Sequence, residues 1–242
     1  MKPPLIQGEI ERRLLINYRV DPEVMARHLP APFEPHLVDG AAVAGICLIR
    51  LGGMRIKGLP RQLGLRSENA AHRVAVEWES PQGRGTGVYI PRRDSDSMVN
   101  RAVGGRLYPG LHFPATFRVQ ETPSEVHVAY TARDGSAEVD VAIRVVDELE
   151  GSAIFRNVAE ASAFFERGAV GFSATRDSAH FDGLELRTAA WKVEPAVVIR
   201  AHSSYFDDRT RFPAGSVVLD SALIMREVPV TWAPLPKLRA TR

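Results

Sequence analysis

The sequence predicts a mainly β protein with short helices, built as a closed or strongly curved antiparallel sheet around a pocket. Runs of β-branched and aromatic residues with strand-like alternation recur from residue 12 to residue 230. Helical periodicity with capping residues is confined to a few short segments. No internal repeat or low-complexity linker divides the 242 residues, so we expect a single domain spanning residues 1–242.

The first expected elements are a strand, a short helix and a second strand. Residues 12–20 are rich in branched and aromatic side chains, as is typical of a strand. Asp21 and Pro22 then supply a helix cap and a first helical residue. The nearly continuous apolar run 41–51 predicts a central strand. Residues 52–71 contain many glycine, proline and polar residues, and we expect them to form a long loop.

The middle of the chain alternates clearly. Residues 72–80 form a predicted strand with two distinct faces. One face carries Val74, Val76 and Trp78, and the other carries Arg73, Ala75, Glu77 and Glu79. Residues 86–90 continue as strand after a turn. Residues 94–105 have capping residues in front and glycines behind, which indicates a helix.

The second half is again dominated by strands. Three strands are expected at 114–121, 124–132 and 137–146. Asn157 and Glu160 have the spacing of a capping box, and they predict a helix that ends at Gly168. Further strands are expected at 169–176, 184–193, 196–204 and 216–230.

Composition excludes several classes of function. The net charge is only +2, and the basic residues are interleaved with acids, so we expect no nucleic-acid partner. No run approaches the roughly 18 apolar residues of a membrane span, and the N-terminus lacks the apolar stretch of a signal peptide. We therefore expect a soluble, cytoplasmic protein. Cys47 is the only cysteine and has no partner for an internal disulfide. We interpret it as a small buried hydrophobe, with a nucleophile as the alternative.

Common catalytic motifs are absent. The chain contains no GxSxG, GxxxxGK[ST] or HExxH sequence. None of its seven histidines pairs with another at the spacing of metal ligands. We therefore expect no cofactor and no metal.

Two stretches carry a resemblance to a known superfamily. "YRVDPEVMARHLPAPFEP" (18–35) resembles the N-terminal signature of acetoacetate decarboxylase and its relatives, and "GGRLYPGLHFPA" (104–115) is similar to their active-site segment. Within that superfamily the chain looks most like an allied family of uncharacterised proteins. This resemblance runs through residues 87–115 and extends to "FFERGAVGFSATRD" and "SALIMREVPVTW". It implies an acetoacetate decarboxylase-like closed antiparallel β-barrel around a pocket and, by analogy, a homo-oligomer.

The chain departs from the decarboxylase at the reactive position. In that enzyme the first lysine after Tyr-Pro attacks the substrate ketone to form an imine, and the neighbouring lysine lowers the pKa of the first. Gly110 and Leu111 occupy these positions here, so the defining reaction is not expected from this loop. The lysines of the chain are Lys2, Lys57, Lys192 and Lys237. Lys192 alternates with Trp191 and Val193 and is expected to face solvent, with a relocated imine-forming role as the alternative.

Five residues are candidates for the site. Glu68 lies where the superfamily carries an active-site carboxylate, and His112 could transfer a proton near neutral pH, so these two are the catalytic candidates. Arg73 could hold an anion bidentately, Tyr108 could donate a hydrogen bond, and Gly110 lies in the substrate loop. Each has a structural alternative, such as a surface arginine, a hydrogen-bonded loop histidine or a packed tyrosine.

These observations predict a pocket protein that binds or acts on a small organic acid or carbonyl compound, without Schiff-base chemistry at the usual loop. If the protein is an enzyme, we expect acid–base chemistry. The alternative is a non-catalytic ligand-binding or interaction module on the same scaffold. Nucleic acid, membrane and cofactor partners are not expected.

Overall fold

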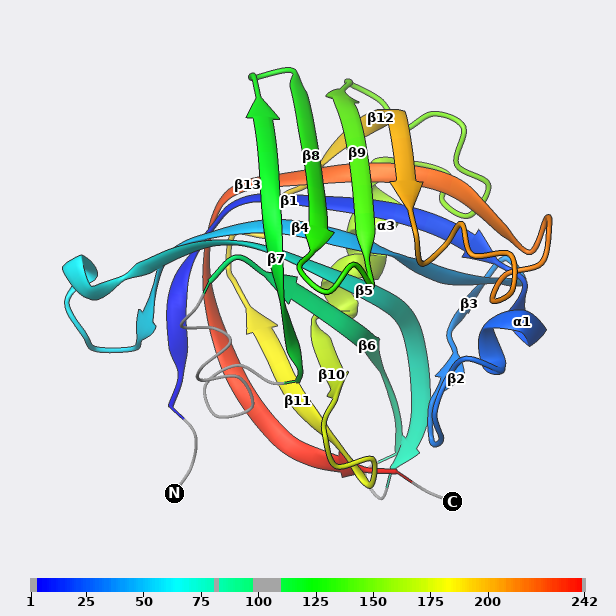
Figure 1. Ribbon diagram of the computed structural model, residues 1–242, viewed down its shortest axis with the longest axis horizontal. Helices are drawn as coiled ribbons and strands as arrows, with labels where there is room; N and C mark the ends of the chain where they lie inside the picture. The colour runs from blue at the N-terminus through cyan, green and yellow to red at the C-terminus, as the bar shows by residue number, and fades with distance from the viewer. Residues whose placement is uncertain (1–3, 81–82, 98–109, 241–242) are drawn as a thin grey trace.

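The computed structural model describes residues 4–80, 83–97 and 110–240, and strands dominate this part of the chain (Figure 1). The strands are β1 (Ile6–Val20), β2 (Glu34–Pro35), β3 (Leu37–Val38), β4 (Ala41–Ile56), β5 (Leu65–Ser80), β6 (Gly83–Ser95), β7 (His112–Glu121), β8 (Glu125–Ala132), β9 (Glu138–Val145), β10 (Val170–Ala174), β11 (His180–Arg187), β12 (Glu194–Ser203) and β13 (Val217–Arg239). The helices are α1 (Pro22–Ala26), α3 (Val158–Arg167) and the short 3-10 helix η1 (Arg61–Leu63).

The strands form one large sheet that closes on itself through hydrogen bonds. Its order is β11-β10-β6-β7-β8-β9-β12-β13-β1-β4-β5-β2, with β3 beside β4 and further pairings between β11 and β13 and between β5 and β6. A ring therefore runs through β13, β1, β4, β5, β6, β10 and β11 back to β13. The mainly β fold class predicted from the sequence is confirmed. The sheet is not purely antiparallel, because β6 pairs in parallel with both β7 and β10.

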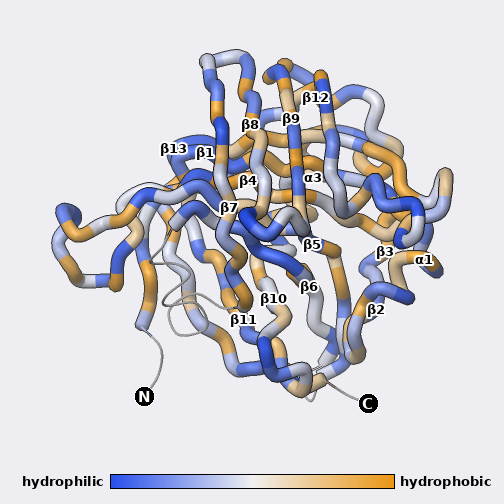
Figure 2. Tube along the Cα trace, viewed as in Figure 1, coloured by the Kyte–Doolittle hydropathy of each residue, from blue (hydrophilic) through white to orange (hydrophobic). Residues whose placement is uncertain are grey.

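The central strands β1, β4 and β5 bury residues on both faces. Leu14 and Ile16 of β1 belong to the main core, whereas Leu15 packs in a second core with Cys47 and Phe165. At the outer hairpins one face is exposed, and hydrophobic and hydrophilic colours alternate along β8 and β9 in Figure 2. A strand with two buried faces can present side chains to an internal cavity without leaving the sheet.

The predicted long loop at 52–71 is wrong, because strand pairing continues through most of it. Met54 of β4 pairs with Leu65 of β5, beyond a register shift that follows Leu51. Gly53 has φ +59°, a left-handed conformation that glycine adopts readily. The glycines are therefore accommodated as a β-bulge inside the hairpin instead of ending the strands.

The helix predicted at 94–105 is wrong at its first residues, which are strand. Asp94 and Ser95 belong to β6, where they pair with Ala70 and Asn69 of β5. Residues 98–105, the remainder of the predicted helix, lie outside the described residues.

Both described α-helices begin at the predicted caps. Asp21 Oδ1 accepts backbone hydrogen bonds at the start of α1, and Asn157 Oδ1 accepts one from Glu160 N at 2.9 Å at the start of α3. Glu160 does not complete the predicted capping box, because its carboxylate accepts from Arg156 N at 2.9 Å. The buried face of α3 packs Phe165 against the second core. Among the described residues, no helix is long and apolar enough to cross a membrane.

Candidate functional site

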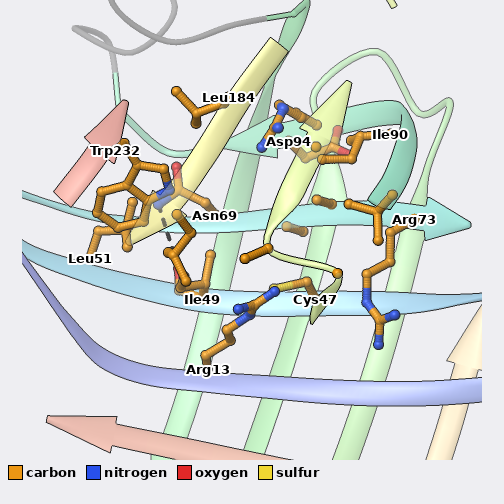
Figure 3. A pocket seen from close by; sticks show the side chains of 18 of the residues that line it. Arg13, Cys47, Ile49, Leu51, Asn69, Arg73, Ile90, Asp94, Leu184 and Trp232 are labelled. Atoms are coloured by element: carbon orange, nitrogen blue, oxygen red, sulfur yellow. Dashed lines mark hydrogen bonds between the residues drawn. The ribbon is translucent and has the colours of Figure 1, made fainter. Parts of the chain in front are cut away.

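A cavity of about 130 Å³ lies on the second-core side of the sheet, where Phe165 of α3 contributes to its lining. Figure 3 shows side chains that line it. Its apolar wall includes Ile49, Leu51, Ile90, Phe165, Leu184 and Trp232. Its polar and reactive lining consists of Arg13, Cys47, Asn69, Arg73, Arg93, Asp94 and His112. An engineered apolar cavity of about 150 Å³ binds benzene, so a cavity of this volume suits a small ligand.

Arg73 on β5 is the most deeply buried arginine of the cavity, with 3% of its surface exposed. Its Nη2 donates to Asn17 Oδ1, and its guanidinium lies 4.6 Å from the centre of the Phe165 ring. Its Nε and Nη1 have no hydrogen-bond partner among the described residues. Gly45 faces it on β4, where an added Cβ would come within 3.2 Å of Nη2. Burial lowers the pKa of Arg73 to about 10.

Two further arginines face the same cavity from neighbouring strands. Arg13 Nε of β1 donates to Cys47 Sγ at 3.0 Å, and Arg93 Nε of β6 donates to Ser173 Oγ at 3.1 Å. Burial lowers the pKa of Arg93 to about 10, and Cys47 opposes this shift.

No aspartate or glutamate forms an ion pair with the three cavity arginines. Arg13, Arg73 and Arg93 form no ion pair within the described parts of the chain. The remaining segments, 1–3, 81–82, 98–109 and 241–242, contain no aspartate or glutamate. The cavity therefore concentrates positive charge in an apolar setting, which favours an anionic ligand.

Asp94 does not neutralise this charge, although it lines the cavity. It is fully buried, and its carboxylate accepts two hydrogen bonds from Arg92, at 2.9 Å from Nε and 2.8 Å from Nη2. Tyr130 donates a third hydrogen bond at 3.2 Å. Burial raises the pKa of Asp94, and the hydrogen bonds from Arg92 oppose the rise. The counter-charge of Asp94 is thus Arg92, two residues earlier on the same face of β6.

His112 reaches the cavity because of strand register. It is the first residue of β7 and pairs with Arg93 of β6, which in turn pairs with Ala71 of β5. All three residues line the cavity. The structure therefore brings two sequence candidates, Arg73 and His112, to one site.

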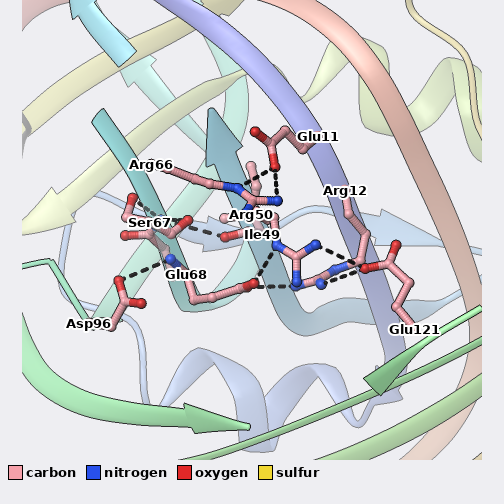
Figure 4. Close-up of polar contacts among 10 residues, drawn as sticks. Glu11, Arg12, Ile49, Arg50, Arg66, Ser67, Glu68, Asp96 and Glu121 are labelled. Carbon is pink, nitrogen blue, oxygen red and sulfur yellow. Dashed lines mark hydrogen bonds and ion pairs between the residues drawn. The ribbon is translucent and has the colours of Figure 1, made fainter. Parts of the chain in front are cut away.

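Glu68 lies outside this cavity (Figure 4). Its Oε1 accepts from Arg50 Nε at 2.6 Å, and its Oε2 accepts from Arg12 Nη2 at 2.6 Å. Both arginines also donate to Glu121 Oε2, Arg12 at 3.2 Å and Arg50 at 3.1 Å. Alternation along β5 sends Asn69 and Arg73 toward the cavity and Glu68 into this four-residue ion-pair network.

Gly110 lies behind the cavity wall. It has φ +86°, and a Cβ added to it would come 2.5 Å from Cβ of Ser173, the residue that holds Arg93. Tyr108, the remaining substrate-binding candidate, lies outside the described residues.

No lysine of the described chain lines the cavity. Lys57 and Lys192 are exposed, and Lys237 forms an ion pair with Asp182 at 3.4 Å. Lys192 lies outside strand β11, while its neighbour Trp191 packs on the second core. Lys2 lies outside the described residues.

Sequence reasoning missed Arg13 and Arg93. Arg13 follows another arginine, and alternation places one of the two on each face without indicating which one meets a cavity. The available signal was an arginine pair inside an apolar strand, "ERRLLINY", where a buried charge needs a reason. Arg93 sits in a second pair, "IPRRDS", with the same ambiguity.

Comparison with known proteins places the chain in a family. Residues 8–218 match the model of DUF2071, which is described as an uncharacterized conserved protein. The chain belongs to this family. The match spans β1 to the start of β13 and includes every polar residue that lines the cavity. No curated protein matches the chain.

Solved structures similar to this DUF2071 protein share its fold. An acetoacetate decarboxylase-like enzyme from Sphingomonas wittichii RW1 has a TM-score of 0.63 and 11% identity, covering 100% of this chain and 95% of that one. Acetoacetate decarboxylase from Legionella pneumophila has a TM-score of 0.59 and 13% identity, covering 97% and 88%. The enduracididine biosynthesis enzyme MppR, complexed with pyruvate, has a TM-score of 0.59 and 12% identity, covering 100% and 91%. These identities establish the fold alone.

Proposed function

We propose that this DUF2071 protein binds a small organic acid, such as a 2-oxo acid, in the cavity that Phe165 of α3 helps to line. Arg73 holds the carboxylate, with Arg13 and Arg93 adding positive charge. The observation that carries this proposal is the convergence of three arginines without a carboxylate partner on a small apolar cavity. An uncompensated buried charge costs several kcal/mol, and a bound anion would offset that cost.

The size and chemistry of the cavity support the same ligand class. A volume of about 130 Å³ suits a molecule of a few non-hydrogen atoms. The structurally similar MppR is complexed with pyruvate, which combines a carboxylate with a ketone. Gly110 provides no amine, so the ligand is held without an imine at this loop.

If the ligand is transformed, His112 is the group placed to move a proton. It lines the cavity beside Arg93, and an imidazole exchanges protons near neutral pH. Glu68, whose carboxylate is occupied by Arg12 and Arg50, takes a structural role in this proposal. The alternative, a binding module without catalysis, is favoured by the absence of lysine from the described cavity lining. If wild type converts a bound oxo acid and His112→Asn does not, the protein is an enzyme and not a binding module.

Thermal unfolding in the presence of small acids tests the proposal. Acetate and pyruvate should raise the Tm at constant ionic strength, since a ligand at about 100 times its Kd stabilises by about 2.7 kcal/mol. The neutral analogues acetamide and acetone should have no effect. Arg73→Met should abolish the shift, because it removes the buried guanidinium without leaving a large void.

Arg144→Met is the matched control, because Arg144 is exposed and pairs with Glu125 away from the cavity. It should keep the full shift. Equal responses of wild type and Arg73→Met, or no response of wild type to any carboxylate, would remove the basis of the proposed function.

A further inference from the structure

We propose that Cys47 is the nucleophile of this cavity, and that its sulfur adds reversibly to the carbonyl carbon of a bound 2-oxo acid. This inference rests on the proposed function, since the arginines must first hold the carboxylate. It replaces the missing amine of the loop with a thiol on a different element, the central strand β4.

The position of Cys47 supports a reactive role. The thiol is 6% exposed and lines the cavity, and Arg13 Nε lies 3.0 Å from its sulfur. In Figure 3 Cys47 appears between Arg13 and Arg73. The sulfur therefore accepts a hydrogen bond from one guanidinium at the wall of a cavity that two further arginines line, where a bound ligand can reach it.

A second observation at the same cavity points to a ligand independently of the thiol. Arg73 is 97% buried, yet its Nε and Nη1 have no partner among the described residues. Buried donors are normally satisfied, so two unpartnered donors in a cavity wall indicate a missing acceptor. A carboxylate would supply such an acceptor through a charge-assisted hydrogen bond. The carbonyl of a 2-oxo acid is bonded directly to this carboxylate, which limits how far it can lie from the sulfur.

Among the described cavity residues, Cys47 is the only one with a thiol, hydroxyl or amine. The step it would perform is an addition that balances without an oxidant or reductant. The sulfur forms a bond to the carbonyl carbon, the carbon–oxygen π bond breaks, and its electron pair moves to oxygen. The proton lost by the thiol ends on that oxygen. The product is a thiohemiketal, and reversal releases the intact oxo acid.

Alkylation rates test the reactivity of Cys47 directly. The chain contains one cysteine, so every thiol alkylation on the protein reports on this residue. We compare the alkylation rate with anionic iodoacetate to the rate with neutral iodoacetamide. The ratio of these two rates should be higher in wild type than in Arg73→Met by about tenfold or more. Tenfold corresponds to about 1.4 kcal/mol of charge-assisted binding. Pyruvate should slow the reaction, and Arg144→Met should behave as wild type. A thiol that resists both reagents in the folded protein would overturn the inference.

Carbon-13 NMR with pyruvate labelled at the ketone carbon tests the bond itself. Wild type should show a protein-bound signal of a tetrahedral carbon that Cys47→Ala lacks. Cys47→Ala should keep the full Tm shift with acetate, which has a carboxylate but no ketone, and should lose part of the shift with pyruvate. The variant removes one small atom group from the wall, so it should remain folded.

The outcomes separate the two proposals. If acetate and pyruvate stabilise wild type and Cys47→Ala equally, and no tetrahedral signal appears, the role of Cys47 is refuted while the arginine site stands. If neither acid stabilises wild type, the proposed function fails, and the inference built on it fails too.

Discussion

Arg12 and Arg73 show how differently two buried arginines can be used. Both are almost fully buried, at 1% and 3% exposure. Arg12 forms ion pairs with Glu68 and Glu121, so its charge is compensated within the fold. Arg73 donates a hydrogen bond to an amide and lies over an aromatic ring, but it forms no ion pair in the described chain. The first arrangement serves stability, whereas the second carries a desolvation cost that a ligand can offset.

His72, the residue before Arg73, predicts an acid-sensitive fold. It is 1% exposed, and burial lowers its pKa to about 3, with Arg92 and Arg211 acting in the same direction. The unfolded chain binds a proton at this histidine below about pH 6.5, but the folded chain does not. The stability that His72 supports above pH 6.5 is therefore lost progressively as the pH falls toward 3, by up to about 1.4 kcal/mol per pH unit.

Urea denaturation at several pH values between 7 and 4 measures this slope. His72→Gln removes the titrating group. It should reduce the slope of the free energy of unfolding against pH by up to about 1.4 kcal/mol per pH unit, the effect of one bound proton. His202→Gln is the control, since His202 is exposed and pairs with Asp207. Identical slopes in wild type and His72→Gln would contradict the prediction.

At the scale of elements, the start of β7 depends on a residue without a side chain. Gly110 combines φ +86° with a neighbouring Ser173, whose Cβ would lie 2.5 Å from an added Cβ. Gly135, between β8 and β9, has φ +71° but no atom within 4 Å of such a Cβ. Substituting each glycine by alanine therefore separates two costs in free energy, that of the left-handed backbone conformation and that of a steric clash.

We predict that Gly135→Ala lowers the free energy of unfolding by about 1–2 kcal/mol, the cost of a left-handed residue. Gly110→Ala should cost this amount and at least about 1 kcal/mol more, because packed neighbours resist an extra carbon. Chemical denaturation of both variants gives the comparison. Equal losses would show that the packing around Gly110 adjusts freely.

At the scale of the whole molecule, the pairing of β11 with β13 closes the ring of strands. Residues 231–239 of β13 provide this pairing, and Trp232 among them lines the cavity. We predict that deleting residues 231–242 makes amides in β10 and β11 exchange much faster with solvent and abolishes stabilisation by acetate. The β4–β5 ladder should keep its protection, because neither of its strands pairs with β13. Hydrogen exchange followed by mass spectrometry measures both regions, and unchanged protection of β11 would refute this view of closure.

The elements of this architecture could largely be predicted, because strand alternation and helix caps are local signals. The strand at 137–146 and the cap at Asn157 needed only their own neighbours in sequence. The loop predicted at 52–71 failed because a bulge beside Gly53 is stabilised by pairing with a distant strand. The site was harder still. Which of Arg12 and Arg13 meets the cavity depends on what packs against each face, and that is settled only by the order of strands around the ring.

The tight fit at Gly110 also bears on how such a chain can evolve. A single mutation to lysine would place a long side chain on an unfavourable backbone conformation and against Ser173. Making room would require Ser173 to change as well, and that serine holds Arg93. A lysine at this position is therefore reached only through variants that are impaired in folding or in the placement of Arg93. Selection for a stable fold would oppose those intermediates, so sequence change in this protein is expected in the walls of the cavity and not at position 110.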